Sequence, residues 1–120
     1  MNVSDEQPCA RVLIIEDEPM IMMLLEEILL AAGFQIAGSM KNLDDALAAI
    51  DRGGFDVAIL DANLRGKSSS PAAEALAARG LPFIVASGYS SAQREEFAGV
   101  PFVQKPFDAS QLISALHSVL

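Results

Sequence analysis

Cysteine, histidine and tryptophan are nearly absent from this chain, which has one cysteine, one histidine and no tryptophan in 120 residues. The single cysteine, Cys9, has no partner for an internal disulfide. With only Cys9 and His117, the chain has no cluster of the ligands that zinc prefers. The N-terminus also lacks the basic, apolar and small-residue regions of a secretory signal. We therefore expect a cytoplasmic protein without a zinc centre.

Long hydrophobic runs and an excess of positive charge are missing as well. The most hydrophobic stretch, residues 20–32, is too short to span a bilayer and contains Glu26 and Glu27. Eight basic residues against sixteen acidic ones leave a formal net charge of −8, and the basic residues are scattered along the chain. This distribution disfavours membrane insertion and direct binding to nucleic acid.

What the chain does have is enough apolar sequence for one compact domain. Hydrophobic residues make up 52% of its 120 residues, which is sufficient to bury a core at this size. We expect a polar tail over residues 1–9 and a single folded domain over residues 10–120, without repeats or an interdomain linker.

Short apolar runs alternate with segments of helical spacing along this domain. Pro19 suits the first turn of a helix, Asn42 is a predicted helix cap, and Ser70 with Pro71 opens an alanine-rich helix. Asp108, with Gln111 three residues later, predicts the start of the last helix. The apolar runs predict strands over residues 11–15, 34–38, 55–60, 81–86 and 100–103. Residues 66–69 are predicted as a loop.

This alternation of strand and helix predicts a doubly wound α/β fold with a five-stranded parallel sheet and helices on both faces. Residues 87–99 are weakly patterned and predict one short helix at most. In sheets of this type, the ligand site lies beyond the carboxyl ends of the strands. The residues that follow each strand are therefore the candidates for chemistry.

Polar side chains follow four of the predicted strands: Glu16, Asp17, Asp61, Asn63, Ser87 and Lys105. Any one of them alone would be an ordinary loop residue. If the first and third strands are neighbours, however, three carboxylates converge, and their repulsion is costly without a cation or raised pKa values. Oxygen ligands of this kind match Mg²⁺ better than zinc.

Lys105 and Ser87 extend this predicted metal site into a phosphoryl site. The lysine supplies a positive charge, and the serine hydroxyl is able to donate to an anionic oxygen. An ionised Asp61 is a suitable nucleophile toward phosphorus, provided that nearby cations neutralise the transferring group. The expected product is an aspartyl phosphate on Asp61.

At this point the chain resembles the response regulator receiver family of two-component signalling, from Val12 to the final helix. The motifs that carry the resemblance are VLIIEDEP at 12–19, DVAILD at 56–61, Ala86-Ser87 and KPF at 105–107. The resemblance implies a flavodoxin-like (βα)5 fold with strand order 2-1-3-4-5. It also implies that Glu16, Asp17, Asp61 and the backbone carbonyl of Asn63 bind Mg²⁺, and that Ser87 and Lys105 contact the phosphoryl group.

The resemblance extends to switch residues and also shows departures from the family pattern. Phe102 falls where receivers carry an aromatic switch, although it is also explained as a core residue of a short strand. Tyr89 either covers the phosphoryl pocket or packs on the fourth segment. The spacing from Ser87 to Lys105 is short by about one helical turn, so we expect a short or missing fourth helix. With Ser87-Gly88-Tyr89, this is similar to single-domain receivers that carry a Phe-Ala-Thr-Gly-variable-Tyr stretch.

The resemblance implies a stand-alone receiver that takes its phosphoryl group from a histidine kinase or phosphotransfer protein. It would then bind a downstream protein or act as a phosphate sink, with no enzymatic activity beyond its own phosphorylation and slow dephosphorylation. Two alternatives remain open. One is a pseudo-receiver that binds partners without phosphorylation. The other is a phosphohydrolase of the haloacid dehalogenase type, although DANLR at 61–65 lacks that family's second aspartate.

Overall fold

The computed structural model describes residues 10–88, 97, 99–105 and 108–120. Five parallel strands form its central sheet: β1 (Arg11–Ile15), β2 (Gln35–Met40), β3 (Val57–Asp61), β6 (Phe83–Ser87) and β7 (Phe102–Gln104). Their order across the sheet is β2-β1-β3-β6-β7, which confirms the predicted order 2-1-3-4-5. The predicted polar tail and most of the predicted short fourth helix region, residues 1–9 and 89–96, lie outside the described residues.

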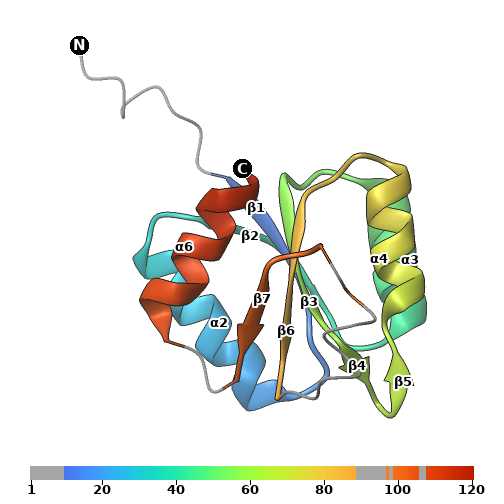
Figure 1. Ribbon diagram of the computed structural model, residues 1–120, viewed down its shortest axis with the longest axis horizontal. Coiled ribbons are helices and arrows are strands. Elements are labelled where there is room, and N and C mark those ends of the chain that lie inside the picture. The colour runs from blue at the N-terminus through green and yellow to red at the C-terminus, as the bar shows by residue number, and fades with distance from the viewer. Residues whose placement is uncertain (1–9, 89–96, 98, 106–107) are drawn as a thin grey trace.

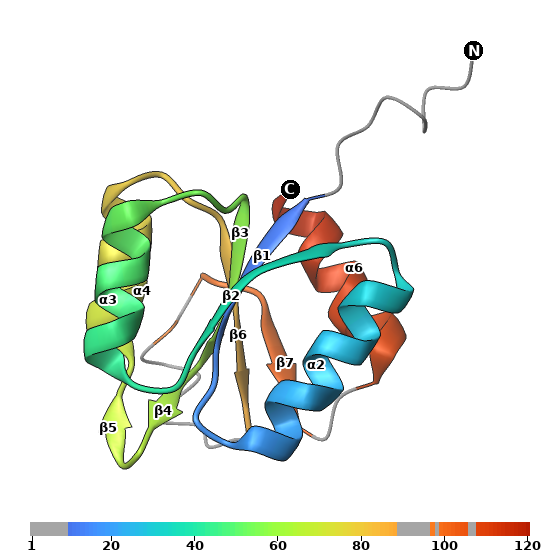
Figure 2. The same ribbon diagram turned by 180° about the vertical axis from the view of Figure 1, so that it is seen from behind.

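Helices cover both faces of this sheet, as Figures 1 and 2 show from opposite sides. One face carries α2 (Pro19–Ala31) and α6 (Ala109–Val119), and the other carries α3 (Leu43–Arg52) and α4 (Ser70–Ala78). The described residues therefore form the three-layered, doubly wound α/β fold that the sequence predicts.

The two central strands are apolar on both sides, because each face packs against helices. In β1, Val12 and Ile14 belong to the core beneath α2 and α6, whereas Leu13 and Ile15 belong to the core beneath α3 and α4. The strand β3 alternates in the same way and is buried along its whole length. Such continuous burial explains why these runs lack the polar alternation of a half-exposed strand.

Local capping signals fix the beginnings of the helices. Pro19 occupies the first turn of α2, and the Asn42 side chain accepts a hydrogen bond of 2.8 Å from the Asp45 backbone N–H at the start of α3. Asp108 accepts a bond from the Ser110 N–H at the start of α6. These caps lie at the predicted helix starts.

The segment after β3 differs from the prediction. In place of a loop over residues 66–69, the chain forms a two-stranded antiparallel hairpin from β4 (Asn63–Leu64) and β5 (Lys67–Ser68). Arg65 and Gly66 connect the strands with φ angles of 53° and 82°. Positive φ at both positions is what a tight type I′ hairpin turn requires, and glycine adopts it without strain.

Candidate functional site

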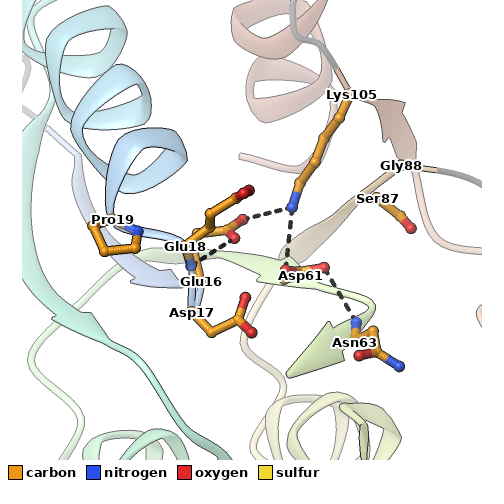
Figure 3. A pocket seen from close by; sticks show the side chains of 9 residues that line it. All are labelled: Glu16, Asp17, Glu18, Pro19, Asp61, Asn63, Ser87, Gly88 and Lys105. Atoms are coloured by element: carbon orange, nitrogen blue, oxygen red, sulfur yellow. Dashed lines mark hydrogen bonds and ion pairs between the residues drawn. The ribbon is translucent and has the colours of Figure 1, made fainter. Parts of the chain in front are cut away.

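The carboxyl ends of β1, β3, β6 and β7 meet at one edge of the sheet, and a polar pocket opens there (Figure 3). Because parallel strands all end on the same side, residues that are distant in sequence become neighbours at this edge. The pocket is lined by Glu16, Asp17, Glu18, Pro19, Asp61, Asn63, Ser87, Gly88 and Lys105. All six residues predicted for the metal and phosphoryl site therefore lie in one pocket.

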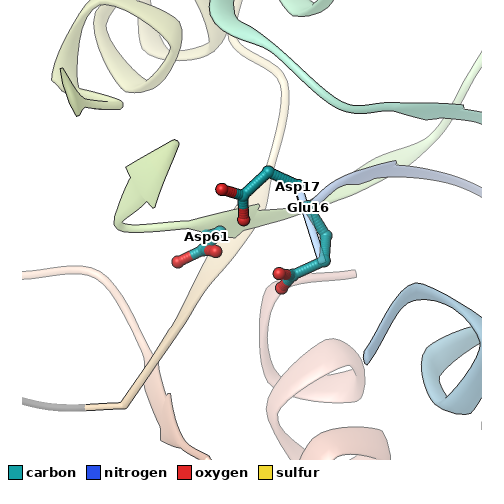
Figure 4. A group of neighbouring side chains, drawn as sticks. All are labelled: Glu16, Asp17 and Asp61. Carbon is teal, nitrogen blue, oxygen red and sulfur yellow. The ribbon is translucent and has the colours of Figure 1, made fainter. Parts of the chain in front are cut away.

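Three of the side chains that line this pocket are neighbouring carboxylates (Figure 4). Oxygen atoms of Glu16, Asp17 and Asp61 all lie within 4.8 Å of one another. Glu16 and Asp61 are buried, with 1% and 6% of their surface exposed, whereas Asp17 is half-buried. Clustered acids in so little water repel one another unless a cation or a proton joins them.

Lys105 supplies one cation from the end of β7. Its Nζ atom lies 2.9 Å from Glu16 Oε1 and 3.1 Å from Asp61 Oδ2, so the ammonium group bridges the two buried acids. The backbone holds the lysine in place, since its N–H donates to the Ser87 carbonyl at 2.7 Å. One lysine beside three carboxylates leaves the pocket with a net negative charge.

The backbone near each acid also orients its carboxylate. Asp61 Oδ1 accepts a hydrogen bond from the Asn63 N–H at 3.2 Å, and Glu16 Oε2 accepts one from the Glu18 N–H at 3.2 Å. The buried Glu16 Oε1 has its ion pair with Lys105, but no donor among the described residues meets hydrogen-bond geometry there. The Lys105 ammonium group at 2.9 Å is therefore the charged partner of this oxygen.

Burial dominates the ionisation of these groups. It raises the pKa of Glu16 to about 7, with Lys105 opposing the rise and Asp61 adding to it. Burial likewise raises the pKa of Asp61, and Lys105 opposes this too. Burial alone would lower the pKa of Lys105, but its contacts with Glu16 and Asp61 outweigh it, so that pKa is raised. The lysine is thus a permanent cation near neutral pH, whereas Glu16 is poised to titrate.

The family of the chain follows from a match along nearly its whole length. A family model described as response regulator receiver domain matches residues 12–117. The chain belongs to the response regulator receiver family. Receivers generally serve signalling, and the acidic pocket lies at the predicted strand ends of this receiver.

Known receivers of similar structure support the same assignment. The solution structure of SdrG from Sphingomonas melonis Fr1 is 42% identical to the chain with a TM-score of 0.83, covering 92% of this chain and 96% of that one. The response regulator PhyR from Brucella abortus is 28% identical with a TM-score of 0.80, covering 95% of this chain and 49% of PhyR.

Curated relatives give the same family from sequence alone. The transcriptional regulatory protein PdtaR from Mycobacterium tuberculosis is 32% identical over 112 residues, which cover 89% of this chain and 55% of PdtaR. The sensory transduction protein RegX3 of the same species is 33% identical over 114 residues, which are 91% of this chain and 50% of RegX3. The chain thus spans about half the length of these curated relatives.

Of the two predicted switch aromatics, only Phe102 lies within the described residues, and it is not among those that line the pocket. Phe102 is half-buried in β7 and packs against the core beneath α3 and α4. It also lines a groove between β7 and α6, away from the acids. Tyr89 lies outside the described residues, as does Pro106. The roles of Phe102 and Tyr89 as switches, and of the Asn63 carbonyl as a metal ligand, stay predictions.

Three residues that line the pocket were not predicted for it: Glu18, Pro19 and Gly88. Pro19 was predicted only for the first turn of a helix, and Glu18 only as part of the acidic motif at 12–19. Ser69 was also missed. It is fully buried, and its hydroxyl donates to the Asp61 carbonyl at 2.5 Å. Nothing in the run Ser68-Ser69-Ser70 distinguishes this serine from its neighbours.

Within the described residues, no helix combines the length and the apolar character needed to cross a membrane.

Proposed function

We propose that this receiver accepts a phosphoryl group on Asp61 in a Mg²⁺-dependent reaction, with a histidine kinase or a phosphotransfer protein as donor. The observation that carries the proposal is the gathering of Glu16, Asp17 and Asp61 within 4.8 Å beside the Lys105 ammonium group. Membership of the receiver family supports it.

The residues of the pocket fit a magnesium ion. The candidate ligands are oxygens of Glu16, Asp17 and Asp61, to which the predicted Asn63 carbonyl would be added. Hard oxygen ligands with positions left for water and a phosphoryl oxygen are typical of Mg²⁺ sites, and Lys105 alone does not balance the three carboxylates. When bound, Mg²⁺ would neutralise charge on the transferring phosphoryl group.

Phosphoryl transfer would use the Asp61 carboxylate as nucleophile. One carboxylate oxygen forms a bond to phosphorus while the bond from phosphorus to the donor's histidine nitrogen breaks, and the electron pair stays on that nitrogen. Asp61 has to be ionised for this step. Lys105 at 3.1 Å and the Asn63 N–H at 3.2 Å both favour the ionised form against the effect of burial.

Lys105 and Ser87 would respond to the new charge. Phosphorylation adds about −1.5 to −2 charges to a pocket that is already negative, so Lys105 would move from Glu16 toward the phosphoryl oxygens. Ser87 lies at the end of β6 and lines the pocket, so its hydroxyl is placed to donate to the same group. Displacement of these two residues would alter the neighbouring β6 and β7 segments and, with them, Phe102.

The likeness to SdrG, of which the chain covers 96%, supports a stand-alone receiver that signals by binding another protein or drains phosphate from its donor. A cytoplasmic location agrees with this role. The receiver would catalyse only its own phosphorylation and slow dephosphorylation.

The test is to incubate the protein with Mg²⁺ and a small acyl phosphate and to weigh the intact chain. We expect an adduct of about +80 Da that is absent without Mg²⁺ and absent in Asp61→Asn. Asp56→Asn is a matched control, because this exposed aspartate lies in the same segment, away from the pocket, and accepts from the Arg11 N–H.

Other outcomes separate the alternatives. An adduct that persists in Asp61→Asn would identify a different acceptor. A wild-type chain that never gains mass, yet binds the same partner with and without the phosphodonor, would indicate a pseudo-receiver. Rapid release of phosphate from many esters would favour a phosphohydrolase.

A further inference from the structure

The β4–β5 hairpin is tied to the phosphoacceptor strand at its base. The Ser69 hydroxyl donates to the Asp61 carbonyl at 2.5 Å, and the Ser69 N–H donates to the Ala62 carbonyl at 3.0 Å. Ser69 has none of its surface exposed. A buried carbonyl that loses its donor becomes costly, so these bonds hold the end of β3 to the start of α4.

The turn of the same hairpin is tied to the metal-site carboxylate of another strand. The Arg65 N–H donates to Asp17 Oδ2 at 2.9 Å, across 48 positions of sequence. This bond occupies one oxygen of a half-buried carboxylate that its acidic neighbours would otherwise repel toward solvent. An oxygen of Asp17 also belongs to the cluster with Glu16 and Asp61.

Asn63 connects the base of the hairpin with its turn. Its N–H donates to Asp61 Oδ1, and its side-chain oxygen accepts from the Gly66 N–H at 2.9 Å. Leu64 packs the hairpin against the core beneath α3 and α4, and only 2% of its surface is exposed. The hairpin therefore contacts both acids through bonds that do not depend on exposed side chains.

From these contacts we propose that the hairpin is a brace that sets the separation of the Asp17 and Asp61 carboxylates, and that Ser69 is its positioning residue. This inference rests on the proposed function, because it concerns the same metal and phosphoryl site. Ser69 touches no reacting atom. It acts through the backbone of Asp61 and through the hairpin on Asp17.

The first test is made on the metal-free protein. In Ser69→Ala, amide hydrogen exchange of Asn63 and Arg65 should accelerate about five- to tenfold, as expected for loss of one supporting hydrogen bond. Exchange in the β1 strand should not change. Ser118→Ala is the matched control, since the Ser118 hydroxyl also donates to a backbone carbonyl, that of Ala115 at 2.6 Å, at an exposed position of α6.

The second test measures Mg²⁺ affinity by NMR titration. Ser69→Ala should weaken binding about tenfold, as is usual when a residue that orients a metal ligand is removed. Ser69→Cys keeps the site filled, with a somewhat larger thiol that is a weak donor, and should resemble the alanine variant. A cysteine variant that behaves like wild type would show that volume, not the hydroxyl, matters and would overturn the role of Ser69.

A variant at the exposed turn keeps the proposal testable if Ser69→Ala does not fold. Gly66 has a φ of 82°, and an added Cβ would meet no atom within 4 Å, so a substitution changes only backbone strain. Gly66→Val is disfavoured at positive φ, whereas Gly66→Asn tolerates it. The valine variant should lose about tenfold in Mg²⁺ affinity and the asparagine variant should not.

Unchanged exchange at Asn63 and Arg65 in folded Ser69→Ala would overturn the brace, as would equal Mg²⁺ affinities of the two Gly66 variants. A wild-type protein that binds no Mg²⁺ would instead contradict the proposed function. The exchange measurement, made without metal, would still decide whether the hairpin is coupled to both acids.

Discussion

The ion pairs of Lys105 and the ion pair of Arg79 differ chiefly in their exposure to water. Lys105 contacts Glu16 and Asp61 at 2.9 and 3.1 Å, and the three side chains are 16%, 1% and 7% exposed. Arg79 contacts Asp51 at 3.5 Å, with side chains 46% and 87% exposed. Water screens the second pair almost completely, whereas the first acts in a medium where charges are costly to leave unpaired.

Unlike the surface pair, the buried pocket has more acidic groups than basic ones. Burial raises the pKa values of Glu16 and Asp61, and the single lysine offsets this only in part. At the surface pair, water would screen an excess of charge of either sign. A phosphoryl or metal switch needs the former environment, because only there does one added charge reorganise its neighbours.

The largest effect is expected when the buried cation is removed. Lys105→Met keeps most of the side-chain volume but leaves Glu16 and Asp61 facing each other, so the free energy of unfolding at pH 8 should fall by roughly 3 kcal/mol. Urea denaturation at pH 8 measures this free energy of unfolding. The loss should shrink at pH 5, where the two acids take up protons more readily.

Lys41→Met is the control for this change, because Lys41 is exposed and should alter the free energy of unfolding by less than about 0.5 kcal/mol. If Lys105→Met were as mild as Lys41→Met, the buried and exposed regions would not differ in the way described.

An effect of similar size is expected from pH. The folded-state pKa of Glu16 is about 7, against an ordinary value of 4.5, so the folded protein holds this proton more tightly than the unfolded chain. Stability should therefore fall as pH rises from about 4.5 to about 7, by roughly 3 kcal/mol from this group. Above about pH 7 the group should add no further change.

Glu16→Gln isolates this contribution. Relative to wild type, the variant should be more stable at pH 8 than at pH 5. Urea denaturation at both pH values measures this difference in the free energy of unfolding. Equal differences at the two pH values would show that Glu16 titrates as an exposed acid does.

The smallest effect is expected at the surface pair. Arg79→Ala should change the free energy of unfolding by no more than about 0.5 kcal/mol, and 0.5 M salt should abolish even that difference. A loss near that of Lys105→Met would mean that exposure does not govern the strength of these pairs.

The strand ends of this receiver were predictable because a parallel sheet brings them together by topology alone. Glu16, Asp61 and Lys105 each follow an apolar run, and the order of the runs in the sequence determines their place at the edge. The family resemblance added the strand order, which periodicity by itself does not give.

The hairpin and Ser69 were not predictable for a physical reason. Strands of two residues, Asn63–Leu64 and Lys67–Ser68, are too short to show a hydrophobic period. The role of Ser69 depends on which carbonyl lies beside its hydroxyl, and that is a property of the folded backbone. The bridging of Glu16 by Lys105 was missed in the same way, since the sequence assigned this lysine to the phosphoryl group alone.

The central claim is that folding creates an acidic pocket that is incomplete until a divalent cation enters. Titration of the ¹⁵N-labelled protein with Mg²⁺ tests it most directly. We expect saturable shifts of the amide signals of Glu16, Asp17, Asp61 and Asn63, and their loss in Asp17→Asn. Signals that stay unchanged at millimolar Mg²⁺, or that shift equally in Asp17→Asn, would contradict the account.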